Sequence, residues 1–442
     1  QFLKKYLKPG PDGVNQVAYG RVTGDDRWAL YEYLVALRLT SIERFNRAEQ
    51  LAYWINLYNA FTVRLVLEFY PVNSIKDIEI SSNPLGGIFS GPWDRKLLDV
   101  GGEPLSLNDI EHRILRPIWG DPRIHYAVKA NPAPEILRKL HSLGSNFDAA
   151  SRVELQMCLD AGAAPEQLSF GNTIKRASDI AWAHEQGIDL FAVDAEEEIE
   201  KIAANAPGAR VYLRIIVDAT EAEWPLTRKF GSGRDKALAL IAMAKDYGLN
   251  PVGLSFHVGS QTRRAAMWAP ILDQVAAVWH AAKAEGHELT LLNIGGGFPA
   301  FYGREIDAPA LYAAEVMRLV QERFGDVPEI MAEPGRGLVA EAGMIAAEVL
   351  LVSKKSDDDL HRWVYLDIGR FSGLAETEGE AIRYQFATAR DHETTGACIL
   401  AGPSCDSADV LYEKQPVQLP LGLRAGDKVM IRACGAYTST YA

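Results

Sequence analysis

The chain has 442 residues, of which 48% are hydrophobic and 24% are charged, a composition typical of a soluble globular protein with two or three domains. Its formal net charge of -12 argues against nucleic acid as a partner, because phosphate binding requires a basic surface, and no apolar run is long enough to span a membrane. Four scattered cysteines without a CxxC pair argue against a disulfide or metal framework, so we expect a cytoplasmic protein without a metal site.

The first 125 residues differ from the rest in charge. Residues 1–125 contain 15 basic and 15 acidic residues, whereas residues 126–442 contain 31 and 43. Amphipathic patterns predict helices over residues 27–39, 47–70 and 106–119. We therefore expect a mostly helical first segment over residues 1–125.

From residue 126 onward, short apolar runs alternate with helix-length segments. The runs that predict strands begin at residues 126, 146, 168, 190, 210, 251, 289 and 329. Strands that alternate with helices indicate a parallel sheet, and eight such units in about 200 residues fit a (β/α)8 barrel over residues 126–340. An open doubly wound sheet is the alternative.

After residue 340 the apolar runs follow one another without helices between them. They cover residues 343–355, 362–369, 381–389, 397–402 and 426–438. Such a series predicts a small β domain over residues 341–442.

Charged residues and glycines stand at the carboxyl ends of four expected strands. They are Lys129, His257, Ser260, the run Gly295 to Gly297, Glu333, Gly335 and Arg336. In a barrel these strand ends meet at one face, and glycine backbone with an arginine fork after the last two strands suits a phosphate group. Taken singly, each of these residues has an ordinary structural explanation, such as a solvated lysine or a glycine turn.

Together they predict a site for pyridoxal phosphate. A lysine can bond covalently to the aldehyde of this cofactor, and an acid can keep its ring nitrogen protonated so that the ring accepts electrons. Lys129 and Glu333 are the candidates for these two roles. His257 is the candidate for stacking on the ring.

Seven motifs in order over residues 126–441 carry a resemblance to a known family. They are YAVKANP, FDAAS, FHVGSQ, LNIGGGFP, EPGR, GPSCDSADVLY and GAYT. This part of the chain resembles the fold-type III pyridoxal-phosphate-dependent amino-acid decarboxylases, and among them the bacterial ornithine or lysine/ornithine decarboxylases. The resemblance implies a barrel of the alanine-racemase and ornithine-decarboxylase kind, pyridoxal phosphate as cofactor, and a head-to-tail homodimer with shared active sites.

The resemblance also implies roles for individual residues. The cofactor set is Lys129, Asp148, His257, Ser260, Gly296, Gly297, Glu333, Gly335, Arg336 and Tyr437. The catalytic residues are Lys129, His257 and Cys405, with Cys405 returning a proton to the substrate Cα after the carboxylate leaves. Glu154 would accompany Asp148 as the second acid near the lysine. In the family, Cys405 and Asp406 reach into the site of the other subunit.

The substrate expected from this resemblance is a basic L-amino acid. Asp406 stands where diaminopimelate decarboxylases have Glu, and it suits a plain amine end. Glu376, Glu378 and Glu380 lie at the place of the family's specificity helix and favour a cationic tail. Gly379 stands where an Asp is expected, so the choice between ornithine and lysine stays open. We expect conversion of L-ornithine to putrescine or of L-lysine to cadaverine in polyamine biosynthesis, with diaminopimelate decarboxylation or racemisation as alternatives.

The first segment resembles a different family. QLAYWINLYNAFTVRLVLEFYP, SLNDIEHRILRP and DPRIHYAV are similar to the domain of unknown function 547, for which no activity can be carried over. The segment that resembles this domain joins the decarboxylase motifs at residues 125–128. It replaces the strand and helix with which the decarboxylases themselves begin. The family's segment after GAYT does not follow here, so we interpret the chain as a fusion with a truncated β domain. A catalytically impaired fusion, whose first domain is a binding module, is the second hypothesis.

Overall fold

The computed structural model describes residues 2–9, 15–42, 45, 47–72, 74–75, 78, 80–81, 89–90, 93, 95–110, 123–218 and 229–441. Contacts divide the chain into two compact units, residues 1–121 and residues 122–442. Among the described residues, no helix has both the length and the apolar surface that a bilayer crossing requires.

The first unit is built on two helices. Its elements are α1 (Phe2–Tyr6), β1 (Leu7–Pro9), β2 (Asn15–Val17), α2 (Gly24–Arg38), α3 (Arg47–Phe69), β3 (Ile80–Ser81), β4 (Phe89–Ser90), β5 (Leu98–Val100) and β6 (Glu103–Leu105). Leu34 of α2 and Leu57 of α3 are buried in a shared core, and the Thr23 hydroxyl caps α2 by accepting the N–H of Asp26. The predicted helices over 27–39 and 47–70 are thus confirmed. The third prediction, 106–119, falls mostly outside the described residues.

Eight parallel strands form a closed barrel in the second unit. They are β7 (Arg123–Ala127), β8 (Asn146–Ala149), β9 (Leu168–Phe170), β10 (Leu190–Val193), β11 (Arg210–Arg214), β12 (Asn250–Ser255), β13 (Leu291–Asn293) and β14 (Glu329–Ala332). Each pairs with the next, and β14 pairs with β7. The barrel prediction is confirmed, and the doubly wound alternative is wrong because the sheet closes on itself.

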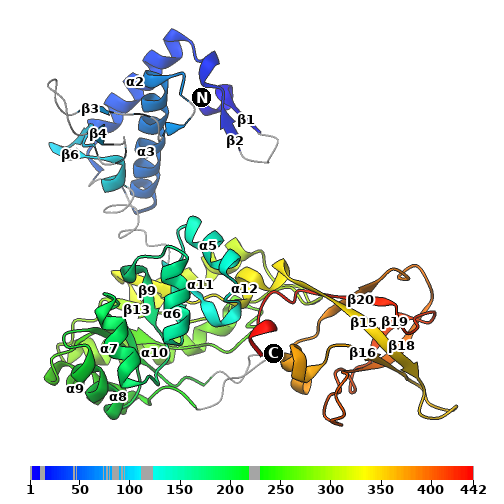
Figure 1. Cartoon of the computed structure of the whole chain (residues 1–442). Helices are drawn as coiled ribbons and strands as arrows, with labels where there is room; N and C mark the ends of the chain where they lie inside the picture. The colour runs from blue at the N-terminus through cyan, green and yellow to red at the C-terminus, as the bar shows by residue number, and fades with distance from the viewer. Residues whose placement is uncertain are drawn as a thin grey trace. The chain divides into compact units, whose positions relative to one another are not determined.

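Helices cover the outside of the barrel (Figure 1). They are α5 (Pro134–Ser142), α6 (Arg152–Asp160), α7 (Ala177–Glu185), α8 (Glu196–Asn205), α9 (Arg234–Asp246), α10 (Ala269–Ala284), α11 (Pro309–Phe324) and the short α12 (Arg336–Val339). Because side chains alternate along a strand, each strand buries one set of side chains against the helices and turns the other set into the barrel. Phe191 and Val193 belong to the outer core, whereas Leu190 and Ala192 pack inside the barrel with Tyr212.

A six-stranded sheet follows the barrel (Figure 1). Its strands are β15 (Met344–Ser353), β16 (Arg362–Leu366), β17 (Gln385–Thr388), β18 (Thr395–Ala401), β19 (Val417–Pro420) and β20 (Lys428–Arg432), in the order β17-β20-β15-β16-β18-β19. The five predicted strands are present, and β19 is the strand that the sequence pattern missed. Between β16 and β17 lies the acidic segment, a kinked 3-10 stretch over Ala375–Glu380.

Candidate active site

A small pocket opens at the carboxyl ends of the barrel strands. It is lined by Ala127, Lys129, His257, Ser260, Gly296, Gly297, Phe298, Glu333, Gly335, Arg336 and Tyr437. The structure therefore brings together every residue of the predicted cofactor set except Asp148, which does not line the pocket. Tyr437 comes from the chain after β20, so the barrel and the β domain both contribute to the pocket.

Lys129 reaches the pocket because β7 ends early. The strand stops at Ala127, and a 3-10 turn over Val128–Ala130 carries Lys129 onto the rim. Its side chain is exposed to the pocket, and its ammonium makes no hydrogen bond or ion pair with the described residues. Burial opposes its charge, but the nearby acids, with Asp148 first, outweigh this and raise the pKa of Lys129 above its usual value. Lys129 is a cation favoured by nearby acids through space, without a hydrogen-bonded partner among the described residues.

Asp148 is the buried acid next to this lysine. Its carboxylate accepts a hydrogen bond from the Ser169 hydroxyl at 3.0 Å, and the residue is 4% exposed. Burial and the charge of Glu333 raise the pKa of Asp148 to about 8, against the opposing effect of Lys129. Glu154 lies one turn into the following helix and accepts the N–H of Ala150 at 2.5 Å. Asp148 therefore holds its proton to a higher pH than an ordinary aspartic acid.

Glu333 is oriented by a residue that the sequence analysis missed. The amide nitrogen of Asn293 donates to Glu333 at 2.5 Å, and its amide oxygen accepts the N–H of Gly295 at 2.9 Å. Asn293 is fully buried at the end of β13. Asn293 thus ties one oxygen of the Glu333 carboxylate to the backbone of Gly295, where the glycine run begins. Glu333 itself lines the pocket.

His257 presents a neutral ring beside the pocket. Its Nδ1 accepts the N–H of Gly259 at 3.0 Å, which leaves the proton of the neutral ring on Nε2. Burial, Arg214 and Lys129 lower the pKa of His257 well below its usual value. A Cβ placed on Gly296 would lie 3.0 Å from Nε2 of His257, so only glycine leaves room for this ring. A neutral imidazole in this place can stack on an aromatic ligand.

The other end of the pocket is an anion cradle. Arg336 is buried and donates to the Ser260 hydroxyl at 3.1 Å and to the Tyr302 hydroxyl at 3.0 Å. Its Nε is buried without a partner among the described residues. Gly297 has φ of +100°, and a Cβ there would lie 2.5 Å from a backbone oxygen. An unpaired guanidinium N–H beside close-packed glycine backbone fits a phosphate group.

The residues of the pocket therefore fit pyridoxal phosphate. Lys129 can bond to the aldehyde carbon of the cofactor, and Glu333 can face its ring nitrogen. His257 can stack on the ring. The cradle around Arg336 can take the phosphate.

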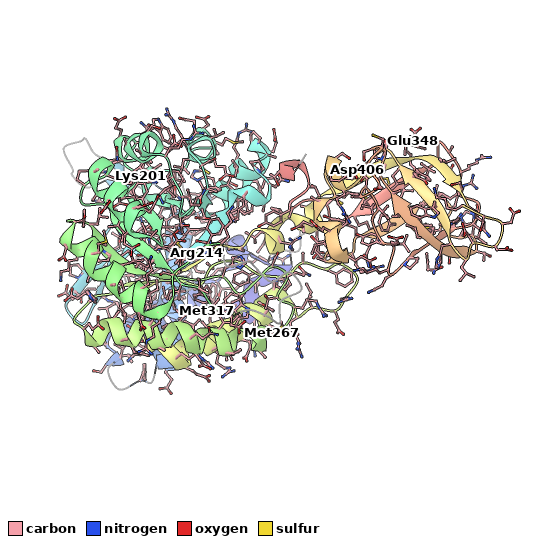
Figure 2. The ribbon with its side chains drawn as sticks, turned by 90° about the horizontal axis from the view of Figure 1, so that it is seen from below. Lys201, Arg214, Met267, Met317, Glu348 and Asp406 are labelled. Carbon is pink, nitrogen blue, oxygen red and sulfur yellow. The ribbon has the colours of Figure 1, made fainter. Side chains whose placement is uncertain are left out.

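Besides Asp148, four predicted site residues do not line this pocket. Cys405 and Asp406 are exposed on the loop after β18, and Figure 2 shows Asp406 on the β domain while Arg214 lies in the barrel. Glu376 is buried in an ion pair with Arg336. Glu380 pairs with Arg383 at 2.8 Å and accepts the backbone N–H of Lys414. The carboxylates of Glu376 and Glu380 are thus both paired with groups of the same chain.

Glu378 differs from these two acids. It is exposed at a tight turn in which Gly379 has φ of +61°, and its carboxylate has no partner among the described residues. The one acid of this segment left for a ligand is therefore Glu378.

Arg214 is a second residue that the sequence analysis missed. It ends β11 on the inward side, and its charge lowers the pKa of His257 and opposes the raised pKa of Lys129. Strand alternation could have identified both missed residues, because Arg214 and Asn293 have the same inward parity as Asp148 and occupy the last position of their strands.

Two family models match the chain. The one described as "Pyridoxal-dependent decarboxylase, pyridoxal binding domain" matches residues 110–340. The one described as "Protein of unknown function, DUF547" matches residues 42–133. The two matches overlap over residues 110–133, around the join expected from the sequence.

Individual proteins match a larger share of the chain than the decarboxylase family model does. A lysine/ornithine decarboxylase of Selenomonas ruminantium is 34% identical over 324 residues, which cover 72% of this chain and 79% of the relative. The structure of a lysine/ornithine decarboxylase from Vibrio vulnificus complexed with cadaverine has a TM-score of 0.65 at 30% identity, over 75% of this chain and 87% of that one. Antizyme inhibitor 2 of Xenopus laevis is 31% identical, over 75% of each chain.

Proposed function

The chain belongs to the family of pyridoxal-dependent decarboxylases, and from this premise we propose that it releases CO2 from a basic L-amino acid. The proposed substrate is L-ornithine, which gives putrescine, with L-lysine as the competing substrate. The observation that carries the proposal is the pocket in which Lys129, Glu333 and Arg336 line one small space. The names of the relatives support the substrate class.

The cofactor supplies an electron sink for the electron pair that remains on the substrate Cα after CO2 leaves. Lys129 would hold the cofactor covalently through Nζ. Glu333, oriented by Asn293, would keep a proton on the ring nitrogen. The neutral ring of His257 would pack on the cofactor ring, and the cradle around Arg336 would bind the phosphate.

Cys405 and Asp406 would act in a second copy of the chain. Both are exposed on a loop outside the pocket, where they are open to another subunit. In the proposed homodimer, Cys405 returns a proton to Cα, and Asp406 binds the distal amine of the substrate. Glu378, as the acid of the acidic segment without a partner among the described residues, would assist at the amine end.

Reduction of the loaded protein tests the proposal. Purified protein is incubated with pyridoxal phosphate, its absorption spectrum is recorded, and borohydride reduction is followed by peptide mapping. We expect a single adduct on Lys129 and CO2 release from L-ornithine or L-lysine. Adducts scattered over surface lysines would overturn the assignment of the site, and a preference for diaminopimelate would overturn the substrate.

A non-catalytic binding protein is the second candidate function. It is favoured by the relative named antizyme inhibitor 2 and by the match of residues 42–133 to a family of unknown function. Release of CO2 separates the candidates. A Lys129 adduct without CO2 release from L-ornithine, L-lysine or diaminopimelate would favour the binding protein.

A further inference from the structure

Arg336 and Glu376 form a buried, end-on ion pair beside the pocket. The two carboxylate oxygens of Glu376 accept from Nη1 and Nη2 of Arg336 at 2.8 and 2.5 Å. The side chains are 3% and 10% exposed. A bidentate pair of this kind fixes the plane of the guanidinium as well as its position, because two parallel hydrogen bonds leave it no rotation.

The remaining N–H groups of Arg336 show which edge is left for a ligand. Its two terminal nitrogens also donate to Tyr302 and Ser260, at 3.0 and 3.1 Å. Nε–H is then the guanidinium group without a partner among the described residues. Ser260 and Arg336 both line the pocket, so the side edge of the guanidinium is what an anion there can bind.

Glu376 is held from its own side as well. Its neighbours Leu374 and Thr377 are fully buried, and the Thr377 hydroxyl donates to the carbonyl of Leu374 at 2.6 Å. The carbonyl of Glu376 accepts the N–H of Ile382 at 3.0 Å. The acid therefore stands on a fixed piece of backbone, which makes it a suitable support for a second side chain.

A substrate amine would have to displace this support. Burial disfavours the charge of Arg336, and Glu376 outweighs burial and raises the pKa of Arg336 above its usual value. Withdrawing the carboxylate would leave a buried guanidinium without its counter-ion, which is costly.

We infer that Glu376 is a positioning residue for the cofactor phosphate, acting through Arg336, and that it does not bind the distal amine of the substrate. This inference rests on the proposed function. It assigns the acidic segment two separate tasks: Glu376 supports the phosphate end of the pocket, while Glu378 remains open to the substrate.

Glu376→Gln is the informative substitution. The amide turns one N–H donor toward an N–H of Arg336, so the guanidinium has to rotate and its Nε edge is displaced. The substitution also removes the repulsion between the Glu376 carboxylate and the phosphate, which by itself would strengthen phosphate binding. We expect the displacement of Arg336 to dominate, because the ion pair that is lost is bidentate and buried. Equilibrium titration of the apoprotein should show pyridoxal phosphate bound about tenfold more weakly, equivalent to about 1.4 kcal/mol. Binding of pyridoxal, which has no phosphate, should not change.

A double-mutant cycle shows whether the effect passes through Arg336. Arg336→Lys keeps the charge but loses the planar fork, so Glu376→Gln should have little further effect on cofactor affinity in that background. An undiminished effect in the Arg336→Lys background would overturn the inference. Thermal unfolding of each apoprotein confirms that the four proteins are folded before they are compared.

Glu378→Gln is the matched control on the same segment. We expect it to leave the affinity for pyridoxal phosphate unchanged, since its carboxylate has no partner among the described residues. At saturating cofactor, Glu376→Gln should leave the KM of the amino acid unchanged. A raised KM together with an unchanged or tighter cofactor affinity would contradict the inference and indicate that Glu376 binds the substrate. Absence of a Lys129 adduct in the unsubstituted protein would instead refute the proposed function, so the two failures are distinguishable.

Discussion

The two ends of the barrel carry similar charges and use them differently. Three strands have a charged residue at the amino end and another at the carboxyl end or within two residues beyond it. The pairs, given from the amino to the carboxyl side, are Arg123 and Lys129, Arg210 and Arg214, and Glu329 and Glu333. Between the two charged layers lies an apolar layer that contains Tyr212 and Met331.

At the amino end the charges are paired directly. Glu329 accepts from Arg123 at 3.0 Å and from Arg210 at 3.3 Å. His125, one inward position above Arg123, is buried and neutral, because burial and Arg123 lower the pKa of His125 to about 3. Among the described residues, the acid of this end is thus paired directly with both arginines, which is the behaviour of a structural cluster.

At the carboxyl end the charges are kept apart. Lys129 has no direct partner among the described residues, Asp148 has a pKa of about 8, and Arg214 acts on both Lys129 and His257 through space. Displaced pKa values within one pocket are typical of a functional site. The comparison teaches that the direct pairing of the charges, more than their number, separates a structural end of a barrel from a catalytic one.

Lys129→Ala should give the largest effect. It removes the amine that holds the cofactor, so CO2 release should fall by several orders of magnitude and the borohydride adduct should disappear. The melting temperature of the apoprotein should fall only slightly, because the ammonium has no direct partner among the described residues and interacts with the acids through space. Arg123→Ala, at the other end of the same strand, is the control and should keep the adduct. Loss of the adduct in Arg123→Ala as well would break the contrast between the two ends.

Glu333→Gln should give the next largest effect. It keeps a hydrogen bond to Asn293 but removes the charge proposed to hold a proton on the cofactor ring. We expect activity to fall by about 100-fold with little change in apoprotein stability. Steady-state CO2 release and thermal unfolding measure the two quantities, and a stability loss equal to that of Glu329→Gln would contradict the expectation.

Glu329→Gln should lower the stability of the protein while leaving its activity nearly unchanged, the reverse of what we expect for Glu333→Gln. It removes the acceptor shared by Arg123 and Arg210, so the free energy of unfolding should fall by about 2 kcal/mol. Activity per folded molecule should stay within about twofold, because the residue lies at the end of the barrel opposite the pocket. Urea unfolding of the apoprotein provides the measurement. A stability equal to that of the unsubstituted protein would show that the pair is too solvated to contribute.

The smallest effects are in the pH dependence of stability, and they have opposite signs at the two ends. Asp148 has a native pKa of about 8 against an ordinary value of 3.8, so between these values the native state binds more protons than the unfolded state. The free energy of unfolding should therefore fall as pH rises from about 4 to about 8. Asp148→Asn should flatten this slope in urea unfolding of the apoprotein.

His125 should produce the reverse slope. Its native pKa of about 3 lies below the ordinary value of 6.5, so in this range the unfolded state binds more protons. Stability should fall as pH drops from about 6.5 toward 3, and His125→Gln should reduce that fall. If each substitution flattened the slope assigned to the other residue, the pKa assignments of the two ends would be wrong.

Much of this architecture could be predicted from local patterns. Apolar runs bounded by glycine and helical periodicity located the eight barrel strands, and the residues at their carboxyl ends gave eight members of the pocket. This worked because a strand's period of two and the common direction of parallel strands determine where its last residues point.

Other features depended on elements far apart in the chain. Strand β19 and the two-residue strands of the first unit were missed, since such short segments have no readable period. Asn293 and Arg214 were missed because an inward polar residue becomes meaningful only after the barrel closes. The expectation that Glu376 and Glu380 face the substrate rested on their charge and on the resemblance of their segment to the family's specificity helix, whereas the folded chain pairs both with arginines.

The sequence by itself determined the barrel, the pocket-facing parity of its strands and the chemical types that meet at its carboxyl end. These follow from local periodicity, which is a property of consecutive residues. Only the tertiary structure decided which charges are paired and which stay open. Glu376 meets Arg336 across 40 residues, whereas Lys129 finds no direct partner among the described residues, and such choices depend on distances that exist only in the folded chain.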